Sequence, residues 1–191
     1  MRGNSMRKDF GPKTWLYPMP VLIIGTYNEN GTPNAMNAAW GGISEENEIT
    51  VCVSDDHKTT ANFLSRGAFT VSPATREEVV AADFVGITSG NDLPDKLQKA
   101  GWHAEKSAFV DAPVFDELPM TLACRVKSYD AESCRLIGEI VNVSVDTAVL
   151  DEKGKIDIDK FSPIVYDPVG HTYRTLGAVV GHAFSEGKKL K

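Results

Sequence analysis

The sequence lacks long apolar runs. Among its 191 residues, no run approaches the roughly 20 apolar residues that a helix needs to cross a bilayer, and the most apolar stretch, residues 18–24, is typical of a buried strand. The first residues also lack the basic, apolar and small-residue order of a signal peptide. We therefore expect a cytoplasmic protein that has no membrane segment.

The sequence is also poor in the motifs and charges that mark nucleotide and nucleic-acid binding. Neither GxGxxG nor GxxxxGK(S/T) occurs, so a Rossmann or P-loop nucleotide site has no support. The net charge is −6, and the chain has no basic, aromatic-rich stripe. We therefore expect no nucleic-acid partner.

Cysteine and histidine are few and dispersed. The three cysteines, Cys52, Cys124 and Cys134, are odd in number and form neither a metal-ligand spacing nor a full disulfide set. The four histidines show no pair at helical spacing around a glutamate. We therefore predict no metal site, and no pair of side chains stands out as a catalytic acid, base or nucleophile.

The length and composition favour a single domain. With 42% hydrophobic residues, the chain is long enough for one well-buried core and short for two. We predict one domain over residues 11–191. Residues 1–10 are interpreted as a tag remnant and a disordered N-terminus, because Met1 to Ser5 precede a second methionine, Met6.

The hydrophobic pattern predicts a mainly β protein. Strand patterns alternate with turn signals such as Asn28 to Gly31, and short helical patterns are closed by Gly67 and Gly101. The expected strands are 21–27, 34–40, 48–54, 68–72, 120–127 and 135–145, and the expected helices are 57–66, 75–83 and 92–100. Because regular βαβ alternation is missing, this order favours a β-barrel with peripheral helices.

Two neighbouring segments carry most of the functional information. Residues 31–43 are rich in small side chains and include Gly41 and Gly42, so their backbone can come close to a flat ligand. The segment His57-Lys-Thr-Thr-Ala-Asn62 offers cationic and hydroxyl donors that suit a phosphate. Together they indicate one ligand with a planar ring at one end and a phosphate at the other.

Each segment alone has a second interpretation. The run of small residues is also typical of a tightly packed strand corner. The second segment is also typical of a solvated turn that caps a helix, with Asp55 or Asp56 at the cap. A helix N-terminus with free amides is itself an anion site, so this interpretation does not exclude binding.

The order of these segments along the chain resembles the flavin reductase-like proteins with an FMN-binding split barrel, and within them the flavoredoxin group. The resemblance runs from about residue 15 to residue 182. Its matching segments are Tyr17-Pro-Met-Pro-Val, Gly25-Thr, residues 31–40, residues 57–62, Phe69-Thr-Val, residues 83–90, Asp95-Lys96, Asp111-Ala-Pro and Cys124.

The resemblance implies a six-stranded split barrel, a homodimer, and FMN bound near the dimer interface. It implies that residues 34–39 lie along the isoalloxazine ring, and that Ser54 and residues 57–60 reach the phosphate and the ribityl chain. Ser89, Gly90 and Tyr173 are left open as further contacts. The implied binding residues are Asn34, Ala35, Met36, Asn37, Ala38, Ala39, Ser54, His57, Lys58, Thr59, Thr60 and Asn62.

FMN can accept a hydride or two single electrons, so the protein need supply only binding, orientation and electrostatics. We predict an oxidoreductase that takes electrons from NADH or NADPH and passes them to flavin, to a small molecule or to a redox partner protein. One alternative is an FMN-containing electron carrier with no nicotinamide site and no small-molecule substrate. The other is a flavin binder with negligible turnover.

Overall fold

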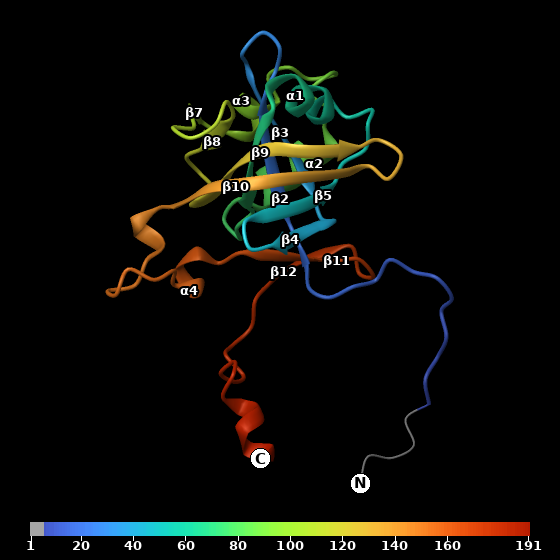
Figure 1. The fold of residues 1–191 in the computed structure, drawn as a ribbon, viewed down its shortest axis with the longest axis vertical. Coiled ribbons are helices and arrows are strands. Elements are labelled where there is room, and N and C mark those ends of the chain that lie inside the picture. The colour runs from blue at the N-terminus through green and yellow to red at the C-terminus, as the bar shows by residue number, and fades with distance from the viewer. Residues whose placement is uncertain (1–5) are drawn as a thin grey trace.

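The computed structural model describes residues 6–191. We interpret residues 1–10 as a tag remnant and a disordered N-terminus; residues 1–5 of this range lie outside the described residues, and the interpretation stays a prediction. Residues 6–18 contain neither helix nor strand and lead into the body of the molecule (Figure 1). No helix among residues 6–191 combines the length and apolar character that crossing a bilayer requires.

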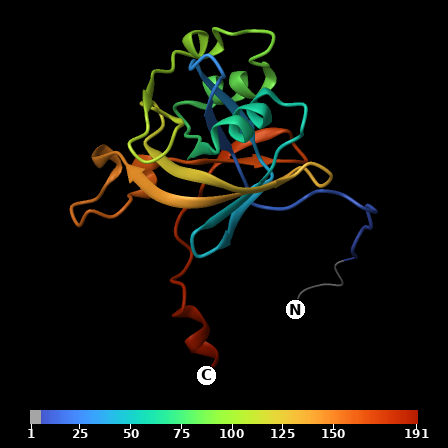
Figure 2. The ribbon, with the colours of Figure 1, turned by 45° about the horizontal axis from the view of Figure 1, so that its top comes forward.

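A curled, fully antiparallel sheet forms the centre of the fold (Figures 1 and 2), with strand order β3-β2-β6-β9-β10-β5-β4. The predicted mainly β architecture with peripheral helices is thus confirmed. Its strands are β2 (Leu22–Tyr27), β3 (Pro33–Ala38), β4 (Gly41–Glu45), β5 (Glu48–Cys52), β6 (Ala68–Pro73), β9 (Met120–Asp130) and β10 (Arg135–Val145).

The main sheet has seven strands, one more than the predicted six. The additional strand is β4, which pairs with β5 at the edge of the sheet. Its sequence begins with two glycines, which are depleted in strands. Pairing with β5 therefore imposes an extended conformation that local propensity does not predict.

Two smaller sheets were also not predicted from the sequence pattern. One joins β1 (Met19–Pro20), β11 (Ile164–Asp167) and β12 (Thr172–Thr175), so that chain segments far apart in sequence lie side by side. The other is the hairpin of β7 (Ala104–Lys106) and β8 (Pro113–Phe115). These strands have at most four residues each, too few to show an alternating pattern.

Helix α1 (Lys58–Arg66) lies where the sequence predicts it. It ends at Gly67, whose φ of 65° lies in the left-handed region, and the amide of Gly67 donates to the carbonyl of Phe63 at 2.8 Å.

The other two predicted helices begin later than expected. Helix α2 (Val79–Ile87) starts after residues 75–76, because Thr75 forms a β-bridge with Pro163 and the amide of Arg76 donates to the Ser162 carbonyl. Helix α3 (Lys96–Ala100) starts after Pro94, since proline disfavours helical geometry in the residue before it. A short helix, α4 (Ile158–Phe161), and 3₁₀ turns at Thr147–Val149 and Glu186–Leu190 were not predicted.

Strand β2 is buried on both faces. Leu22 and Ile24 belong to a core that includes Phe63 of α1, whereas Ile23 packs into a second core with Val85 of α2. This double burial explains why residues 18–24 read as a continuous apolar run rather than as an alternating one. It also fixes β3, which pairs with β2 along its whole length, between α1 and α2.

Candidate functional site

The two segments singled out in the sequence meet in the structure. The side-chain amide of Asn34, on β3, donates a hydrogen bond from Nδ2 to Oγ1 of Thr59, on α1, at 3.1 Å, and both residues are buried. A cavity of about 320 Å³ opens beside this contact, and we call it the first cavity. Its lining includes five of the predicted residues, namely Asn34, Met36, His57, Lys58 and Thr59.

The start of α1 gives the first cavity a positive end. The N-cap residue is His57 rather than Asp55 or Asp56, and within the described residues its side chain makes no capping hydrogen bond. The first-turn amides and the half-buried Lys58 therefore concentrate positive potential where a helix dipole is also positive. This end of the cavity can hold an anion such as a phosphate.

Three further predicted residues form hydrogen bonds within the protein. The hydroxyl of Thr60 donates to the carbonyl of Ser54 at 2.6 Å, which closes the loop between β5 and α1. The amide of Asn62 donates to Oγ1 of Thr26 at 3.0 Å and to Oδ1 of Asn28 at 2.9 Å. In the described structure these side chains support the first cavity rather than line it, and their contact with a ligand stays a prediction.

The small residues of β3 are consistent with both interpretations of this segment, a tightly packed strand and a wall beside a flat ligand. Ala35 and Ala38 are buried in the two cores on opposite faces of the strand, as a tightly packed strand requires. Asn37 faces α2, whose Gly86 approaches so closely that a Cβ there would lie 2.8 Å from Cβ of Asn37. Strand β3 is therefore tightly packed, and it can form a rigid, flat wall beside a ligand.

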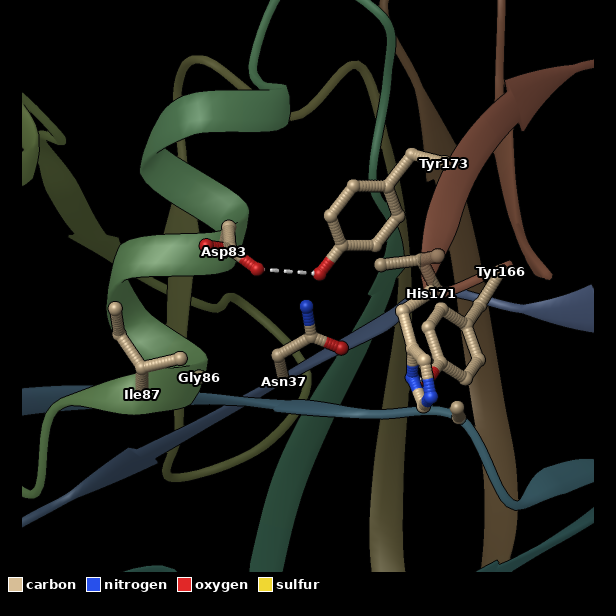
Figure 3. A pocket seen from close by; sticks show the side chains of 9 residues that line it. Asn37, Asp83, Gly86, Ile87, Tyr166, His171 and Tyr173 are labelled. Atoms are coloured by element: carbon tan, nitrogen blue, oxygen red, sulfur yellow. Dashed lines mark hydrogen bonds between the residues drawn. The ribbon is translucent and has the colours of Figure 1, made fainter. Parts of the chain in front are cut away.

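A second cavity, of about 380 Å³, is drawn in Figure 3. Gly86 and Ile87 line both this cavity and the first. The lining of the second cavity also includes the predicted residues Asn37 and Ala39. The C-terminal hairpin of β11 and β12 supplies the opposite wall, with Tyr166, His171 and Tyr173.

The second cavity carries an ordered polar network. The hydroxyl of Tyr173 donates to Oδ1 of Asp83 at 2.7 Å, as drawn in Figure 3. Burial, followed by this hydrogen bond, raises the pKa of Tyr173 to about 12. Nδ2 of Asn37 donates to the Ala82 carbonyl at 3.1 Å. The hydroxyl of Tyr166 and Nδ1 of His171 are 2.9 Å apart.

Sequence reasoning missed Lys96. Its side chain is 3% exposed and lines the first cavity, where Nζ donates to the carbonyls of Thr88 at 2.9 Å and Val85 at 3.3 Å. Burial lowers the pKa of Lys96 to about 8. The pair Asp95-Lys96 was part of the resemblance, but nothing in a short polar helix indicated that the lysine is buried.

The residues left open by the sequence also fall at these cavities. Ser89 and Gly90 line the first cavity and Tyr173 lines the second. Within residues 6–191, no group of three or more histidine, cysteine, aspartate or glutamate side chains is arranged to hold a metal ion.

Comparison with known families assigns the chain to a family. The model of the flavin reductase like domain matches residues 15–176. The chain belongs to this family. Its described fold is the family's split barrel, as the resemblance in sequence implied.

Three solved structures illustrate the similarity. The flavoredoxin of Desulfovibrio vulgaris (Miyazaki F) is 36% identical, with a TM-score of 0.91 over 95% of this chain and 100% of that one. The flavoredoxin of Methanosarcina acetivorans is 24% identical, with a TM-score of 0.87 over 98% and 100% of the chains. An FMN-binding domain of a flavin reductases-like enzyme from Shewanella baltica OS155 is 22% identical, with a TM-score of 0.77 over 85% and 88%.

The Asp83 contact gives a prediction for the titration of Tyr173. Asp83→Asn removes the negative charge beside the hydroxyl but leaves the burial, so the pKa of Tyr173 should fall from about 12 yet stay above the ordinary 10.0. In the unmodified protein folding disfavours the tyrosinate. The resulting contribution to stability is present below pH 10.0 and is lost as the pH rises towards about 12.

Ultraviolet difference titration of each protein against its Tyr173→Phe counterpart isolates this one tyrosine. An Asp83→Asn variant whose Tyr173 titrates as in the unmodified protein would contradict the assigned contact.

Proposed function

We propose that this protein binds FMN across the first and second cavities and acts as an oxidoreductase that takes electrons from NADH or NADPH. Family membership supports a flavin-binding, redox-related function. The observation that carries the proposal is the meeting of Asn34 on β3 with Thr59 on α1 around one cavity. A packed strand wall and a positive helix N-terminus are thereby joined in a single site.

The residues present fit both ends of FMN. Strand β3 would lie along the ring, with Asn34 and Met36 in the first cavity and Asn37 and Ala39 in the second. Gly90 allows the loop after α2 to approach Asn34 closely, because a Cβ there would lie 2.4 Å from Oδ1 of Asn34. At the other end, the residues that would hold the phosphate are His57, Lys58 and Thr59.

The flavin would supply the chemistry of hydride or single-electron transfer, and the chain would bind and orient it. Lys58 and the first amides of α1 would neutralise the phosphate charge, while the buried hydrogen bond from Asn34 to Thr59 keeps β3 and α1 together. The second cavity lies beside the ring wall and offers space for a reactant that exchanges electrons with the flavin.

An electron carrier is the second candidate. It is favoured by the 36% identity to the Desulfovibrio vulgaris flavoredoxin over nearly the whole chain. Such a protein would use FMN without a nicotinamide site and would pass electrons to a redox partner protein. Both candidates are consistent with a cytoplasmic location and require the same FMN site.

We also propose that the chain works as a homodimer. The C-terminal residues 176–191 leave the body as an arm (Figure 1) and expose large apolar side chains, with Val180 101% and Phe184 98% exposed. Trp40 and Ile43 are exposed at the edge strand β4 and the turn before it. Exposed apolar groups beside an open strand edge are features that a second copy would cover.

The central test of function is the visible spectrum of the purified protein, followed by anaerobic titration with NADH and with NADPH. We expect a yellow protein that binds FMN more tightly than FAD, because the start of α1 offers one phosphate site. Bleaching of the flavin by either nucleotide would support the reductase, and bleaching only by a reduced protein would support the carrier. A colourless protein that cannot be reconstituted with FMN would remove both.

Lys58 provides a test of the phosphate end. Lys58→Ala should weaken FMN binding by about tenfold to a hundredfold, since a hydrogen bond to a charged group contributes roughly 1.5–3 kcal/mol and each 1.4 kcal/mol is about tenfold in affinity. Calorimetry with FMN and with riboflavin separates phosphate binding from ring binding, because riboflavin affinity should not change. Lys99→Ala, an exposed lysine paired with Asp95, is the matched control. Equal FMN affinity in both variants would place Lys58 outside the site.

The dimer proposal predicts that assembly and flavin binding are linked. If the partner helps to form the site, dilution should release FMN in parallel with dissociation, by mass action. Analytical ultracentrifugation read at protein and flavin wavelengths measures both. A monomer with full flavin occupancy would refute the interface site and leave the FMN assignment standing.

A further inference from the structure

The second cavity has a wall of three aromatic rings. The ring of Tyr166 lies 6.4 Å from that of His171 and 6.1 Å from that of Tyr173, measured between centroids, at interplanar angles of 51° and 53°. Apolar side chains of Val21 and Ile87 also line the cavity, and in Figure 3 Ile87 lies across from the three rings. Aromatic rings at such separations attract further rings through their faces and edges. The lining therefore suits a flat aromatic ligand.

The polar groups of the cavity beside α2 are occupied by the protein itself. Tyr173 donates to Asp83, and Asn37 donates to the carbonyl of Ala82. Asp83 places a carboxylate in the lining, and none of the nine described lining residues is lysine or arginine. The first cavity, in contrast, is lined by two lysines. The second cavity therefore favours a neutral ligand, because an anion there would lie near a carboxylate and would have no lysine or arginine to pair with.

One polar pair remains at the aromatic wall. The hydroxyl of Tyr166 and Nδ1 of His171 are 2.9 Å apart. A hydroxyl that donates to Nδ1 leaves the proton of a neutral imidazole on Nε2. Among the described residues, Nε2 of His171 has no hydrogen-bond partner. A hydrogen-bond donor is therefore available at the wall of the cavity.

The turn that carries His171 has a fixed geometry. The carboxylate of Asp167 accepts hydrogen bonds from the backbone amides of Val169 and Gly170, each at 3.0 Å. His171 follows with a φ of 50°, in the left-handed region that few residues other than glycine adopt. Histidine tolerates this region better than most residues do, so the turn alone does not indicate a site. The turn matters because it holds the imidazole beside Tyr166 at the cavity.

We propose that the second cavity, on the side of the β11–β12 hairpin, binds a neutral, flat aromatic compound that carries a carbonyl oxygen, and that Nε2 of His171 donates a hydrogen bond to this oxygen. The inference rests on the proposed function, because such a compound would be the small molecule that receives electrons from the flavin. Quinones and aryl ketones belong to this class. A hydrogen bond to the carbonyl oxygen draws electron density from the conjugated ring and makes the compound easier to reduce. His171 thereby determines which acceptors the cavity selects.

Three probes of similar shape test this site. They are 2-acetylnaphthalene, which has the carbonyl, 2-ethylnaphthalene, which lacks it, and 2-naphthoate, which is an anion. Equilibrium dialysis measures their dissociation constants with the flavin-free protein and with the FMN-loaded protein, in which the flavin site is occupied.

Two variants and a control accompany the probes. His171→Phe keeps an aromatic ring and removes the donor, and Tyr166→Phe removes the hydroxyl that orients the imidazole. The control is His182→Phe, because His182 lies in the C-terminal arm and lines neither cavity.

We expect the FMN-loaded protein to bind one 2-acetylnaphthalene per chain. His171→Phe should weaken this binding by about twofold to tenfold, the range that one hydrogen bond contributes to affinity, and should leave the binding of 2-ethylnaphthalene unchanged. Tyr166→Phe should have a smaller effect in the same direction, because the donor remains but its tautomer is no longer fixed. His182→Phe should bind every probe as the unmodified protein does. 2-Naphthoate should bind more weakly than 2-acetylnaphthalene.

An equal loss of affinity for 2-acetylnaphthalene and 2-ethylnaphthalene in His171→Phe would overturn the assigned hydrogen bond, because it would report lost packing alone. Tighter binding of 2-naphthoate than of 2-acetylnaphthalene would overturn the preference for a neutral ligand. If His171→Phe does not fold, His171→Gly decides, since glycine adopts a φ of 50° without strain.

The experiment also separates this inference from the proposed function. An FMN-loaded protein that binds none of the probes would overturn the inference and leave the FMN site standing. An unmodified protein that binds 2-acetylnaphthalene through His171 but does not bind FMN would support the assignment of the cavity and remove the proposed function.

Discussion

The burial of β2 on both of its faces is the constraint on which the candidate site depends. Ile24 packs against the core that contains α1, and Ile23 packs against the core that contains α2. Full burial of one such side chain contributes about 1.5–3 kcal/mol. Because β3 is paired with β2 residue by residue, the same packing places Asn34 and Asn37 against the two helices.

The electrostatics of the site run opposite to those of the whole molecule. The chain carries a net charge of −6, yet the first cavity gathers Lys58, Lys96 and the N-terminus of α1 against one carboxylate, that of Asp56. Salt screens the net charge within about 10 Å, whereas the cavity charges act at contact distance. The whole protein therefore repels an anionic ligand at long range, and the cavity attracts it at short range. Binding of such a ligand depends on contacts in the cavity rather than on long-range electrostatic steering.

The sequence was informative where local pattern decides the structure. The hairpin of β2 and β3, helix α1 with its terminal Gly67, and strand β10 all follow from alternation, turn residues and caps. The sequence failed where pairing across the fold decides. Strand β4 begins with two glycines and is extended because β5 pairs with it, and α2 starts late because Thr75 is held against Pro163.

The candidate site shows the same division. The meeting of Asn34 with Thr59 was expected, because both belong to segments whose composition suits one ligand. The burial of Lys96 was not expected. It depends on how α3 packs against the end of α2. A lysine in a short polar helix is ordinarily exposed. The resemblance to a family included Lys96 in a matching segment, but it did not indicate that the side chain is buried.

The two cavities differ in how much of the chain must exist before each can form. All residues that line the first cavity lie between Asn34 and Lys96, whereas the second cavity also needs Tyr166, His171 and Tyr173 near the C-terminus. On a ribosome, where the chain emerges from its N-terminus, the parts of the first cavity are therefore available long before the second can close. The pairing of β11 with β1 completes the second cavity by joining segments near the two ends of the chain. The contacts of this wall therefore have a larger sequence separation than those of the first cavity.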